Sequence, residues 1–270
     1  MGERIIVRNY QVPISGLPPE AQGLRIAHIS DLHFTRWNKT YVATQKALQE
    51  ADYDLLAATG DFCDFRWRWR RAVEHIRRFC DPLAHKAPVL AVLGNHDHPS
   101  LAEHDGLPLR FLQNEAVHLR IGDARIVVAG VNQCAPQAED LEAALVTCSK
   151  GSRPHVLLAH YPSTIARLGR HEVPLVLSGH THGGQIRFPW IGCLWPNDQI
   201  PRAWARGLHR VGARVLHVSP GIGVSLPIRV RVNCPPEIAI LTMVARPDRV
   251  SETQLQAEPI CSGAAEGCPR

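Results

Sequence analysis

Long hydrophobic runs are missing from this sequence of 270 residues. No stretch approaches the roughly 18 consecutive apolar residues that a membrane-spanning helix needs, so we expect no transmembrane segment. The first ten residues include Glu3 and Arg4 and hold only three apolar residues in a row. This composition does not resemble a secretory signal peptide, and we therefore expect a cytoplasmic protein.

Lysine is scarce, because only four of the 30 basic residues are lysine and the rest are arginine. With 25 acidic residues, the formal net charge is +5. Arginine binds phosphate through two parallel hydrogen bonds, although a coding bias towards arginine would give the same composition. The charge fits an anionic partner but does not distinguish a nucleotide, a nucleic acid and a lipid headgroup. The eight cysteines include no Cys-x-x-Cys pair, which favours reduced thiols.

Segments with strand and helix character alternate along the chain. The predicted strands are 4–12, 24–30, 54–60, 88–94, 155–160 and 174–180, with a hairpin at 117–130 and later strands at 184–188, 206–218 and 236–244. The predicted helices are 41–51, 66–79 and 138–148. Continuously apolar strands such as 88–94 fit a sheet covered on both faces. We predict one α/β domain at 1–245 and a disordered or loosely packed tail at 246–270.

Polar residues that are able to bind metal directly follow five of the predicted strands. They are Asp31 and His33, Asp61 and Asp64, Asn95, His96 and Asp97, His160, and His180 and His182. Loops at the carboxyl ends of strands are where α/β folds place ligands, so five such ends indicate one site. In Asp-x-His and His-x-His, alternate residues can lie on one face of an extended segment and reach one cluster.

The donor types indicate a catalytic rather than a structural metal site. Carboxylate, amide and imidazole groups suit Mn²⁺, Fe, Zn²⁺ or Co²⁺, and the absence of thiolates argues against a structural zinc site. Glycine precedes several of these residues, as in Gly60-Asp61, Gly94-Asn95 and Gly179-His180. Glycine allows the backbone to turn sharply and to approach an ion or a phosphate closely.

The ordered set Asp-x-His, Gly-Asp-x-x-Asp, Gly-Asn-His-Asp, His and Gly-His-Thr-His, within residues 25–182, resembles the calcineurin-like metallophosphoesterases. The resemblance implies a four-layer α/β/β/α sandwich and two divalent metal ions, with Mn²⁺ favoured. The ligands implied for the first ion are Asp31, His33, Asp61 and His182, and those for the second are Asp61, Asn95, His160 and His180. Asp61 would therefore bridge the two ions.

The resemblance also implies a reaction. A hydroxide generated between two cations would attack a phosphodiester or pyrophosphate directly. His96 would be the acid at the leaving oxygen, and Asp64 would orient His96. From the residues alone, Asp64 has an alternative role as a cap of the predicted helix 66–79. Asp97 either assists His96 or bonds to the backbone of its own loop.

The C-terminal half points to a branch of the family. The segments 179–189 and 219–243 resemble a bacterial branch that includes phosphodiesterases acting on UDP-2,3-diacylglucosamine, a lipid A precursor. A soluble cyclic-nucleotide phosphodiesterase or a broad-specificity phosphatase is the alternative within enzymes. A non-catalytic metal-binding scaffold is the alternative from another class, and the complete ligand set with His96 disfavours it. Nothing in the sequence specifies an oligomeric state.

The run Arg66–Arg71 alternates arginine with Trp67 and Trp69. Tryptophan favours the membrane interface and arginine attracts anionic lipid, so the inner membrane face is a candidate partner. On a helix the two tryptophans point about 200° apart, so both reach a membrane only if the segment is extended or one packs inward. A solvated helix face is the alternative. Nucleic-acid binding is disfavoured because the arginines are spread along the chain.

Overall fold

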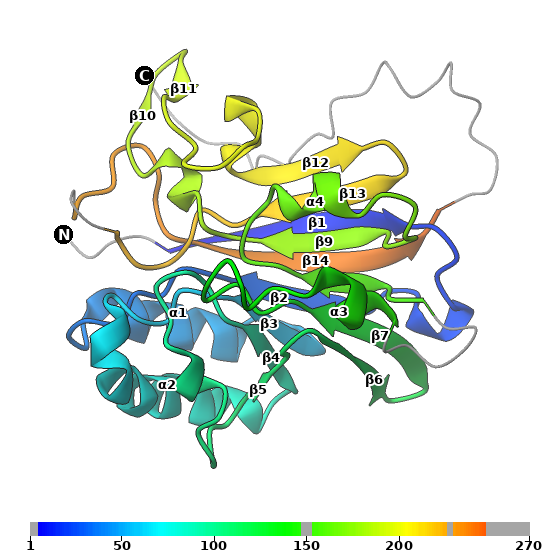
Figure 1. Cartoon of the computed structure of the whole chain (residues 1–270), viewed down its shortest axis with the longest axis horizontal. Helices are drawn as coiled ribbons and strands as arrows, with labels where there is room; N and C mark the ends of the chain where they lie inside the picture. The colour runs from blue at the N-terminus through cyan, green and yellow to red at the C-terminus, as the bar shows by residue number, and fades with distance from the viewer. Residues whose placement is uncertain (1–4, 147–152, 226–228, 247–270) are drawn as a thin grey trace.

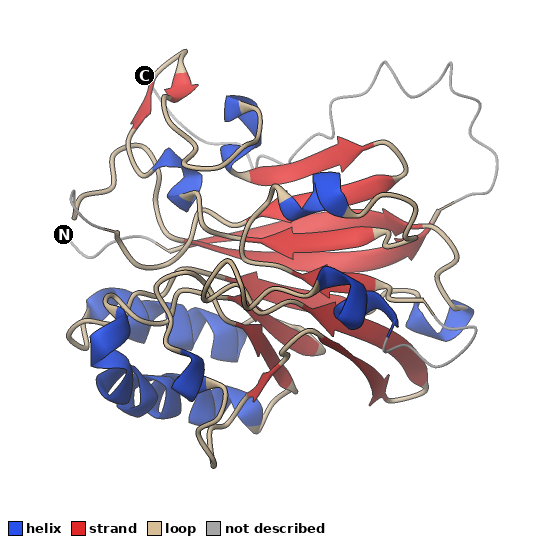
Figure 2. Ribbon diagram, viewed as in Figure 1, coloured by secondary structure: helices blue, strands red, loops and turns tan. Residues whose placement is uncertain are grey.

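Two six-stranded sheets form the centre of the molecule in a computed structural model of the chain (Figures 1 and 2). The structure describes residues 5–146, 153–225 and 229–246. In order across the first sheet, the strands are β1 (Ile6–Ile14), β14 (Glu237–Ala245), β2 (Arg25–Ile29), β3 (Leu55–Thr59), β4 (Val89–Val92) and β5 (Arg110–Phe111). The run from β2 to β5 is parallel, and β14 joins it antiparallel. Chain segments far apart in sequence therefore share one sheet.

The second sheet has a parallel centre with an antiparallel strand at each edge. In order its strands are β12 (Gly207–Val211), β13 (Arg214–Val218), β9 (Leu175–Ser178), β8 (Val156–Leu158), β7 (Ala124–Gly130) and β6 (Glu115–Ile121). Strands β13, β9, β8 and β7 are parallel neighbours. The predicted hairpin is present, because Ile121 pairs with Ala124 across a turn at Gly122 and Asp123.

Helices cover the outer face of each sheet, which completes the four layers. Helices α1 (Lys39–Glu50) and α2 (Trp69–Ala84) lie beside the first sheet, and the short α3 (Leu141–Val146) and α4 (Thr164–Arg167) lie beside the second (Figure 1). The Asn38 side chain starts α1 by accepting hydrogen bonds from the backbone N–H groups of Thr40 and Tyr41. The predicted α/β fold with two sheets is confirmed.

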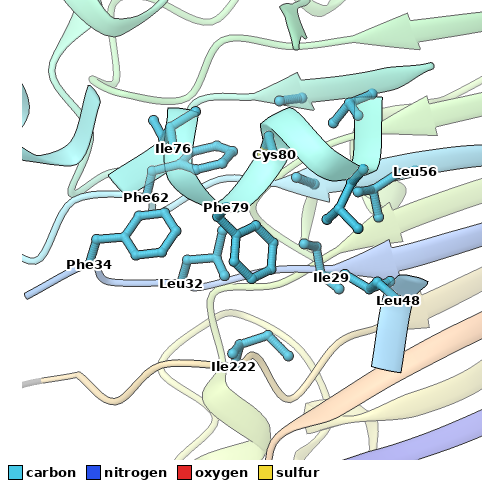
Figure 3. Close-up of a cluster of buried hydrophobic side chains, with 14 of the residues drawn as sticks. Ile29, Leu32, Phe34, Leu48, Leu56, Phe62, Ile76, Phe79, Cys80 and Ile222 are labelled. Carbon is cyan, nitrogen blue, oxygen red and sulfur yellow. The ribbon is translucent and has the colours of Figure 1, made fainter. Parts of the chain in front are cut away.

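Three buried clusters hold the layers together. The first lies between α1, α2 and the first sheet and includes Phe62 and Phe79 (Figure 3). The second lies between the two sheets, where Leu55 and Leu90 face residues such as Val156. The third lies under α3 and α4. Since burying one such side chain contributes about 1.5–3 kcal/mol, these interfaces fix the positions of the strand ends.

Most predicted elements are present, and the differences have physical causes. The predicted helix 66–79 is a 3-10 turn η2 (Arg66–Arg68) followed by α2, which continues to Ala84. Helix α2 is longer than predicted because Cys80 and Leu83 continue the buried face that Ile76 and Phe79 form. The predicted strand 184–188 is the two-residue β10 (Arg187–Phe188), which pairs with β11 (Gly192–Cys193). Almost all of the predicted tail, residues 247–270, lies outside the described residues. No described helix is long and apolar enough to cross a membrane.

Candidate metal centre

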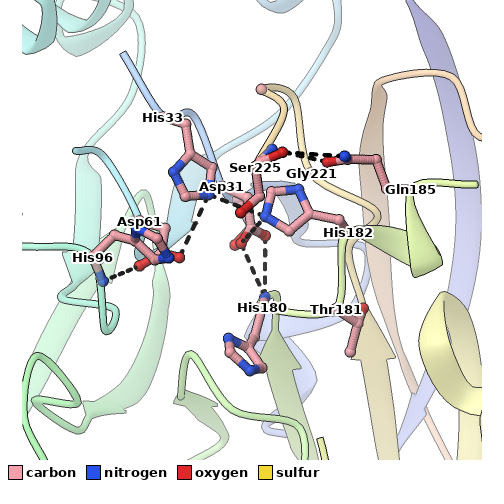
Figure 4. A network of polar contacts seen from close by, with 12 residues as sticks. Asp31, His33, Asp61, His96, His180, Thr181, His182, Gln185, Gly221 and Ser225 are labelled. Carbon is pink, nitrogen blue, oxygen red and sulfur yellow. Dashed lines mark hydrogen bonds and ion pairs between the residues drawn. The ribbon is translucent and has the colours of Figure 1, made fainter. Parts of the chain in front are cut away.

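The loops that follow five strands bring the predicted ligands together. Asp31 and His33 follow β2, Asp61 follows β3, Asn95 follows β4, His160 follows β8, and His180 and His182 follow β9. Both sheets are parallel in this region, so the carboxyl ends of their central strands meet at one edge. Figure 4 shows the side chains of five of them converging: Asp31, His33, Asp61, His180 and His182.

One group of ligand atoms comes from Asp31, His33 and His182, which are all buried. The Nε2 atoms of His33 and His182 lie 3.0 Å apart, and Nε2 of His182 lies 3.5 Å from Oδ1 of Asp31. Among the described residues, Nδ1 of His182 is buried without a hydrogen-bond partner. Ring nitrogens that face each other beside a carboxylate form a donor set that fits a divalent cation.

The second group comes from Asp61, His160 and His180. Nε2 of His160 lies 3.3 Å from Oδ2 of Asp61 and 3.2 Å from Nδ1 of His180. Oδ1 of Asn95 lies 3.1 Å from the same Nε2 atom. All four residues predicted for the second ion therefore lie at one place.

Asp61 lies between the two groups. Its Oδ2 atom lies 3.3 Å from Nε2 of His160 and 3.5 Å from Nε2 of His33. One carboxylate oxygen thus faces an imidazole of each group. This is the geometry that a bridging ligand needs.

Backbone carbonyls orient three of the four imidazoles. Nδ1 of His33 lies 3.0 Å from the Cys63 carbonyl oxygen, Nδ1 of His160 lies 2.7 Å from that of Thr59, and Nε2 of His180 lies 2.9 Å from that of Asn197. A carbonyl oxygen can only accept, so each of these ring nitrogens carries the proton. In His33 and His180, which burial keeps neutral, the opposite ring nitrogen then presents a lone pair to the centre, as metal-ligating histidines do. In His160 the opposite nitrogen carries a proton beside Asp61, and a metal ion would have to replace that proton.

The backbone is left-handed at five of the seven predicted ligands: Asp31, His33, Asp61, His180 and His182, with φ between 42° and 67°. This region is uncommon for residues other than glycine. Such strain persists only where the surrounding structure imposes it, and it concentrates at functional sites. The strained backbone is therefore an indication of function independent of the side chains.

Two glycines beside the ligands have no room for a side chain. A Cβ atom on Gly60, which has φ of 90°, would lie 2.6 Å from the backbone nitrogen of Gly94. A Cβ on Gly94 would lie 2.3 Å from Oδ1 of Asp61. The loops after β3 and β4 can approach each other only because both residues are glycine.

Burial and mutual charge set the ionisation of the ligands. Burial lowers the pKa of His33 and of His180 to about 4, which leaves both imidazoles neutral and able to bind metal. Burial also opposes charge on His160, but the Asp61 carboxylate offsets it and the pKa of His160 rises to about 9. The same pairing overcomes the effect of burial on Asp61 and holds the pKa of this carboxyl well below its usual range. Burial raises the pKa of Asp31 to about 7.

His96 lies at the mouth of the centre and is half-buried. Its backbone N–H donates to Oδ1 of Asp61 over 2.8 Å, and its Nδ1 lies 3.1 Å from the carbonyl oxygen of Asp64. The Asp64 carboxylate accepts a hydrogen bond from Arg229 at 2.9 Å, and His96 bonds to the backbone carbonyl of Asp64 instead. Asp64 also does not cap α2, which begins at Trp69 with no capping side chain.

The buried Asp97 joins two ligand-bearing loops. Its Oδ1 atom accepts from the backbone N–H of Cys63, and its Oδ2 atom accepts from that of Gly94, each over 2.9 Å. Of the two roles left open by the sequence, the geometry is that of a residue bonded to the backbone.

Sequence reasoning missed two parts of the site. Arg229 anchors Asp64 and, with Lys39, lines a cavity of about 350 Å³ that opens beside His33. The backbone N–H groups of Ile222 and Gly223 donate to the carbonyl oxygens of Ser30 and Asp31, which supports the first ligand loop. The pattern Gly221-x-Gly223 was the available signal, since a Cβ on Gly223 would meet the carbonyl oxygen of Leu32 at 2.2 Å.

A two-sheet α/β fold with two adjoining groups of carboxylate and imidazole donors defines a metal-dependent hydrolase. The sequence profile of the calcineurin-like phosphoesterase family matches residues 24–184. The chain belongs to this family and is a metal-dependent phosphohydrolase.

Individual relatives agree with this assignment. The chain is 27% identical over 242 residues to Phosphodiesterase YaeI of Escherichia coli, with 83% of each protein covered. It is 27% identical over 236 residues to the uncharacterized metallophosphoesterase YkoQ of Bacillus subtilis, with 83% of this chain and 84% of that protein covered. The solved 5'-nucleotidase precursor of Thermus thermophilus is similar in fold, with a TM-score of 0.50, 14% identity, and coverage of 82% of this chain and 54% of that one.

Proposed function

We propose that the chain is a phosphodiesterase or pyrophosphatase that works with two divalent ions, one held by each donor group. The observation that carries this proposal is the position of Asp61 Oδ2 between His33 and His160, with His96 bonded to the other oxygen of the same carboxylate. Two ions at these positions would supply Lewis acidity and lower the pKa of a bound water. The residues themselves supply the ligands and the proton donor.

His96 is the proposed proton donor to the leaving oxygen. Its Nδ1–H donates to the Asp64 carbonyl, so Nε2 is the ring atom that can take up and release a second proton. Asp64 acts as a positioning residue through that carbonyl, while Arg229 fixes its carboxylate. The proposed ligands are Asp31, His33, Asp61 and His182 for one ion and Asp61, Asn95, His160 and His180 for the other.

Mn²⁺ is the favoured ion, with Fe, Zn²⁺ and Co²⁺ as alternatives. Four imidazoles in the centre disfavour Mg²⁺, which prefers oxygen ligands and retains water.

A nucleotide-linked lipid such as UDP-2,3-diacylglucosamine is the proposed substrate class. In the cavity beside His33, Arg229 is paired with Asp64, and Lys39 supplies positive charge suited to a nucleotide phosphate. In the run Arg66–Arg71, Trp67 is 71% exposed, although its ring stacks on Phe65 and lies under the Arg68 guanidinium. Trp69 stacks on His98 and packs against the core, so at most Trp67 can meet a membrane. A soluble cyclic-nucleotide phosphodiesterase or a broad-specificity phosphatase is the alternative.

The test is hydrolysis by metal-depleted and reconstituted protein. After exhaustive chelation we expect no hydrolysis of bis-p-nitrophenyl phosphate, and Mn²⁺ or Co²⁺ should restore it better than Mg²⁺. Faster hydrolysis of the diester than of p-nitrophenyl phosphate would support a phosphodiesterase, and the reverse order would favour the phosphatase alternative. Hydrolysis of UDP-diacylglucosamine, compared with hydrolysis of cyclic nucleotides, then distinguishes a nucleotide-linked lipid from a cyclic nucleotide as the substrate. Full activity in excess chelator would exclude the metal mechanism, and a reconstituted protein that binds two ions but hydrolyses nothing would favour the scaffold.

A further inference from the structure

We propose that the β10–β11 hairpin docks this protein on a bilayer that contains anionic lipid, by inserting its aromatic tip into the membrane interface. The hairpin and its flanks run from Phe188 to Asn197. Docking would follow from the surface alone and does not require that the chain hydrolyse a lipid.

The tip of the hairpin carries an unusual amount of exposed apolar surface. Five large apolar side chains within eight residues are exposed: Phe188, Trp190, Ile191, Leu194 and Trp195. Trp190 is fully exposed and Trp195 is 78% exposed. The segment from Phe188 to Asn197 contains no charged residue. Clustered apolar surface of this kind marks an interaction site.

The backbone at the tip is held in a strained form that presents Trp190 outwards. Phe188 pairs with Gly192, so Pro189, Trp190 and Ile191 form the turn. Trp190 has φ of 68°, a region that bulky residues rarely adopt. Within the described part of the chain, neither Trp190 nor Trp195 stacks on another ring or lies under a cation. By contrast, Trp204 near the base stacks on His209 at a centroid distance of 5.8 Å. The strain at Trp190 is therefore not compensated by a ring contact within the described fold.

The surroundings of the tip are positively charged. The 3-10 turn η5 (Arg202–Ala205) packs on β11 and brings Arg202 to the hairpin. Arg187 on β10 and Arg206, which directly follows η5, are two further cations beside the hairpin. The Asp198 carboxylate, which accepts hydrogen bonds from the backbone N–H groups of Ser163 and Gln199, is an opposing charge. The three arginines Arg187, Arg202 and Arg206 still leave an excess of positive charge. A basic collar around an aromatic tip complements an anionic membrane surface.

The shape favours a bilayer over a folded protein as the partner. In Figure 1 the hairpin stands away from both sheets at one corner of the molecule. A narrow projecting turn can enter the soft interface of a bilayer, where tryptophan is favoured.

The base of the hairpin is tied directly to the metal centre. The turn η4 (His182–Gly184) leads into β10, and Nη1 of Arg187 donates to the Gly183 carbonyl over 2.9 Å. On the other side, the Asn197 carbonyl accepts from Nε2 of His180. A docked hairpin would therefore place the metal centre next to the membrane surface.

The test is sedimentation of the full chain with vesicles. We expect the protein to pellet with phosphatidylcholine vesicles that contain phosphatidylglycerol, and less so with phosphatidylcholine alone or at high salt. The Trp190→Ala/Trp195→Ala variant should bind about tenfold more weakly or worse, as expected for losing two buried aromatic rings. Arg202→Gln should weaken binding by about fivefold, and only to the anionic vesicles. Val146→Ala, an exposed apolar residue on α3, should bind like the wild type.

Hydrolysis of bis-p-nitrophenyl phosphate by the same variants checks that the fold and the metal centre are intact. If this activity is absent from the wild type but vesicle binding depends on Trp190 and Trp195, the proposed function fails and the docking inference stands. The inference is overturned if the wild type stays in the supernatant at low salt, or if the double variant binds as tightly. It is also overturned if the wild type self-associates through these tryptophans and does not bind vesicles.

Discussion

The two sheets supply different chemistry to the metal centre. The loops of the first sheet carry both carboxylates and the amide, on Asp31, Asp61 and Asn95, together with one imidazole on His33. The loops of the second sheet carry imidazoles alone, on His160, His180 and His182. All the negative charge therefore comes from one sheet, and each donor group draws on both. Neither sheet alone has a complete donor set, so the centre forms only when the two sheets pack against each other.

The sheets also differ in how their outer faces are covered. Helices α1 and α2 on the first sheet have 12 and 16 residues, whereas α3 and α4 on the second have 6 and 4. The sheets meet through a buried contact close to the centre, where Nδ1 of His28 on β2 lies 2.8 Å from Nδ1 of His217 on β13. Nε2 of His28 lies 2.9 Å from the hydroxyl oxygen of Thr59, whose carbonyl orients His160. The junction of the sheets thus supports the ligands.

The largest effect is expected from Asp61→Asn, which removes the charge that both donor groups share. We expect loss of both ions and a fall in activity of at least about a thousandfold, since metal ions supply several kcal/mol of transition-state stabilisation. Elemental analysis and hydrolysis of bis-p-nitrophenyl phosphate provide the measurements. Asp123→Asn, at the exposed turn between β6 and β7, is the matched control. A variant that retains two ions would show that the first sheet is not the source of the essential charge.

Removing an imidazole of the second sheet should have a smaller and more local effect. His182→Ala and His180→Ala each remove a neutral ligand from one donor group, so we expect each variant to lose one of the two ions. Activity should fall on the order of a hundredfold. In Mn²⁺-loaded protein, the spectrum of exchange-coupled ions should be replaced by that of a single ion. The exposed His85→Ala is the control. If either variant lost both ions, the two donor groups would not bind their ions independently.

His96→Ala should lower turnover without loss of metal, because His96 contacts Asp61 through its backbone. A general acid contributes about 10²–10⁴-fold, and the loss should be greater for an alkyl leaving group than for p-nitrophenolate, which needs less protonation. His98→Ala, whose ring stacks on Trp69, is the control. Equal losses with both leaving groups would argue against proton donation by His96.

The smallest effect concerns the histidine contact between the sheets. Burial, and then the charge of His209, lower the pKa of His217 to about 3, whereas an unfolded histidine has a pKa of about 6.5. Below pH 6.5 the unfolded chain takes up a proton that the folded chain does not, so this contribution to the free energy of unfolding is present above pH 6.5 and is lost as the pH falls. For each such histidine the loss is about 1.4 kcal/mol per pH unit.

His217→Gln should reduce the dependence of the free energy of unfolding on pH below about pH 6.5. Urea unfolding of metal-depleted wild type and variant, between about pH 7.5 and pH 5, gives the difference directly. The midpoint of the variant should depend less on pH. If the unfolding midpoints of wild type and variant depend equally on pH, then His217 does not cause the loss of stability at low pH.

Much of the centre could be predicted because its signals are local. The seven proposed ligand positions each follow an apolar strand, and parallel strands place their carboxyl ends at one edge. The contacts of Asp64 and Asp97 could not be predicted in the same way. The partner of the Asp64 carboxylate, Arg229, lies 165 residues away in the sequence. Asp97 bonds both to the nearby Gly94 and to Cys63, which lies 34 residues away. How the loops pack decides that His96 bonds to the backbone carbonyl of Asp64 and to neither carboxylate.

The sequence by itself determined the strands, the ligand types and their order, because hydrophobic continuity and glycine-flanked polar residues are short-range properties. Only the tertiary structure decided that Asp61 lies between two imidazole groups, and that backbone carbonyls orient three of the four imidazoles. It also decided that the hairpin with Trp190 projects while Trp69 packs inward. These features depend on contacts between segments far apart in the chain. Their geometry is fixed by the packing of two sheets and not by any local pattern.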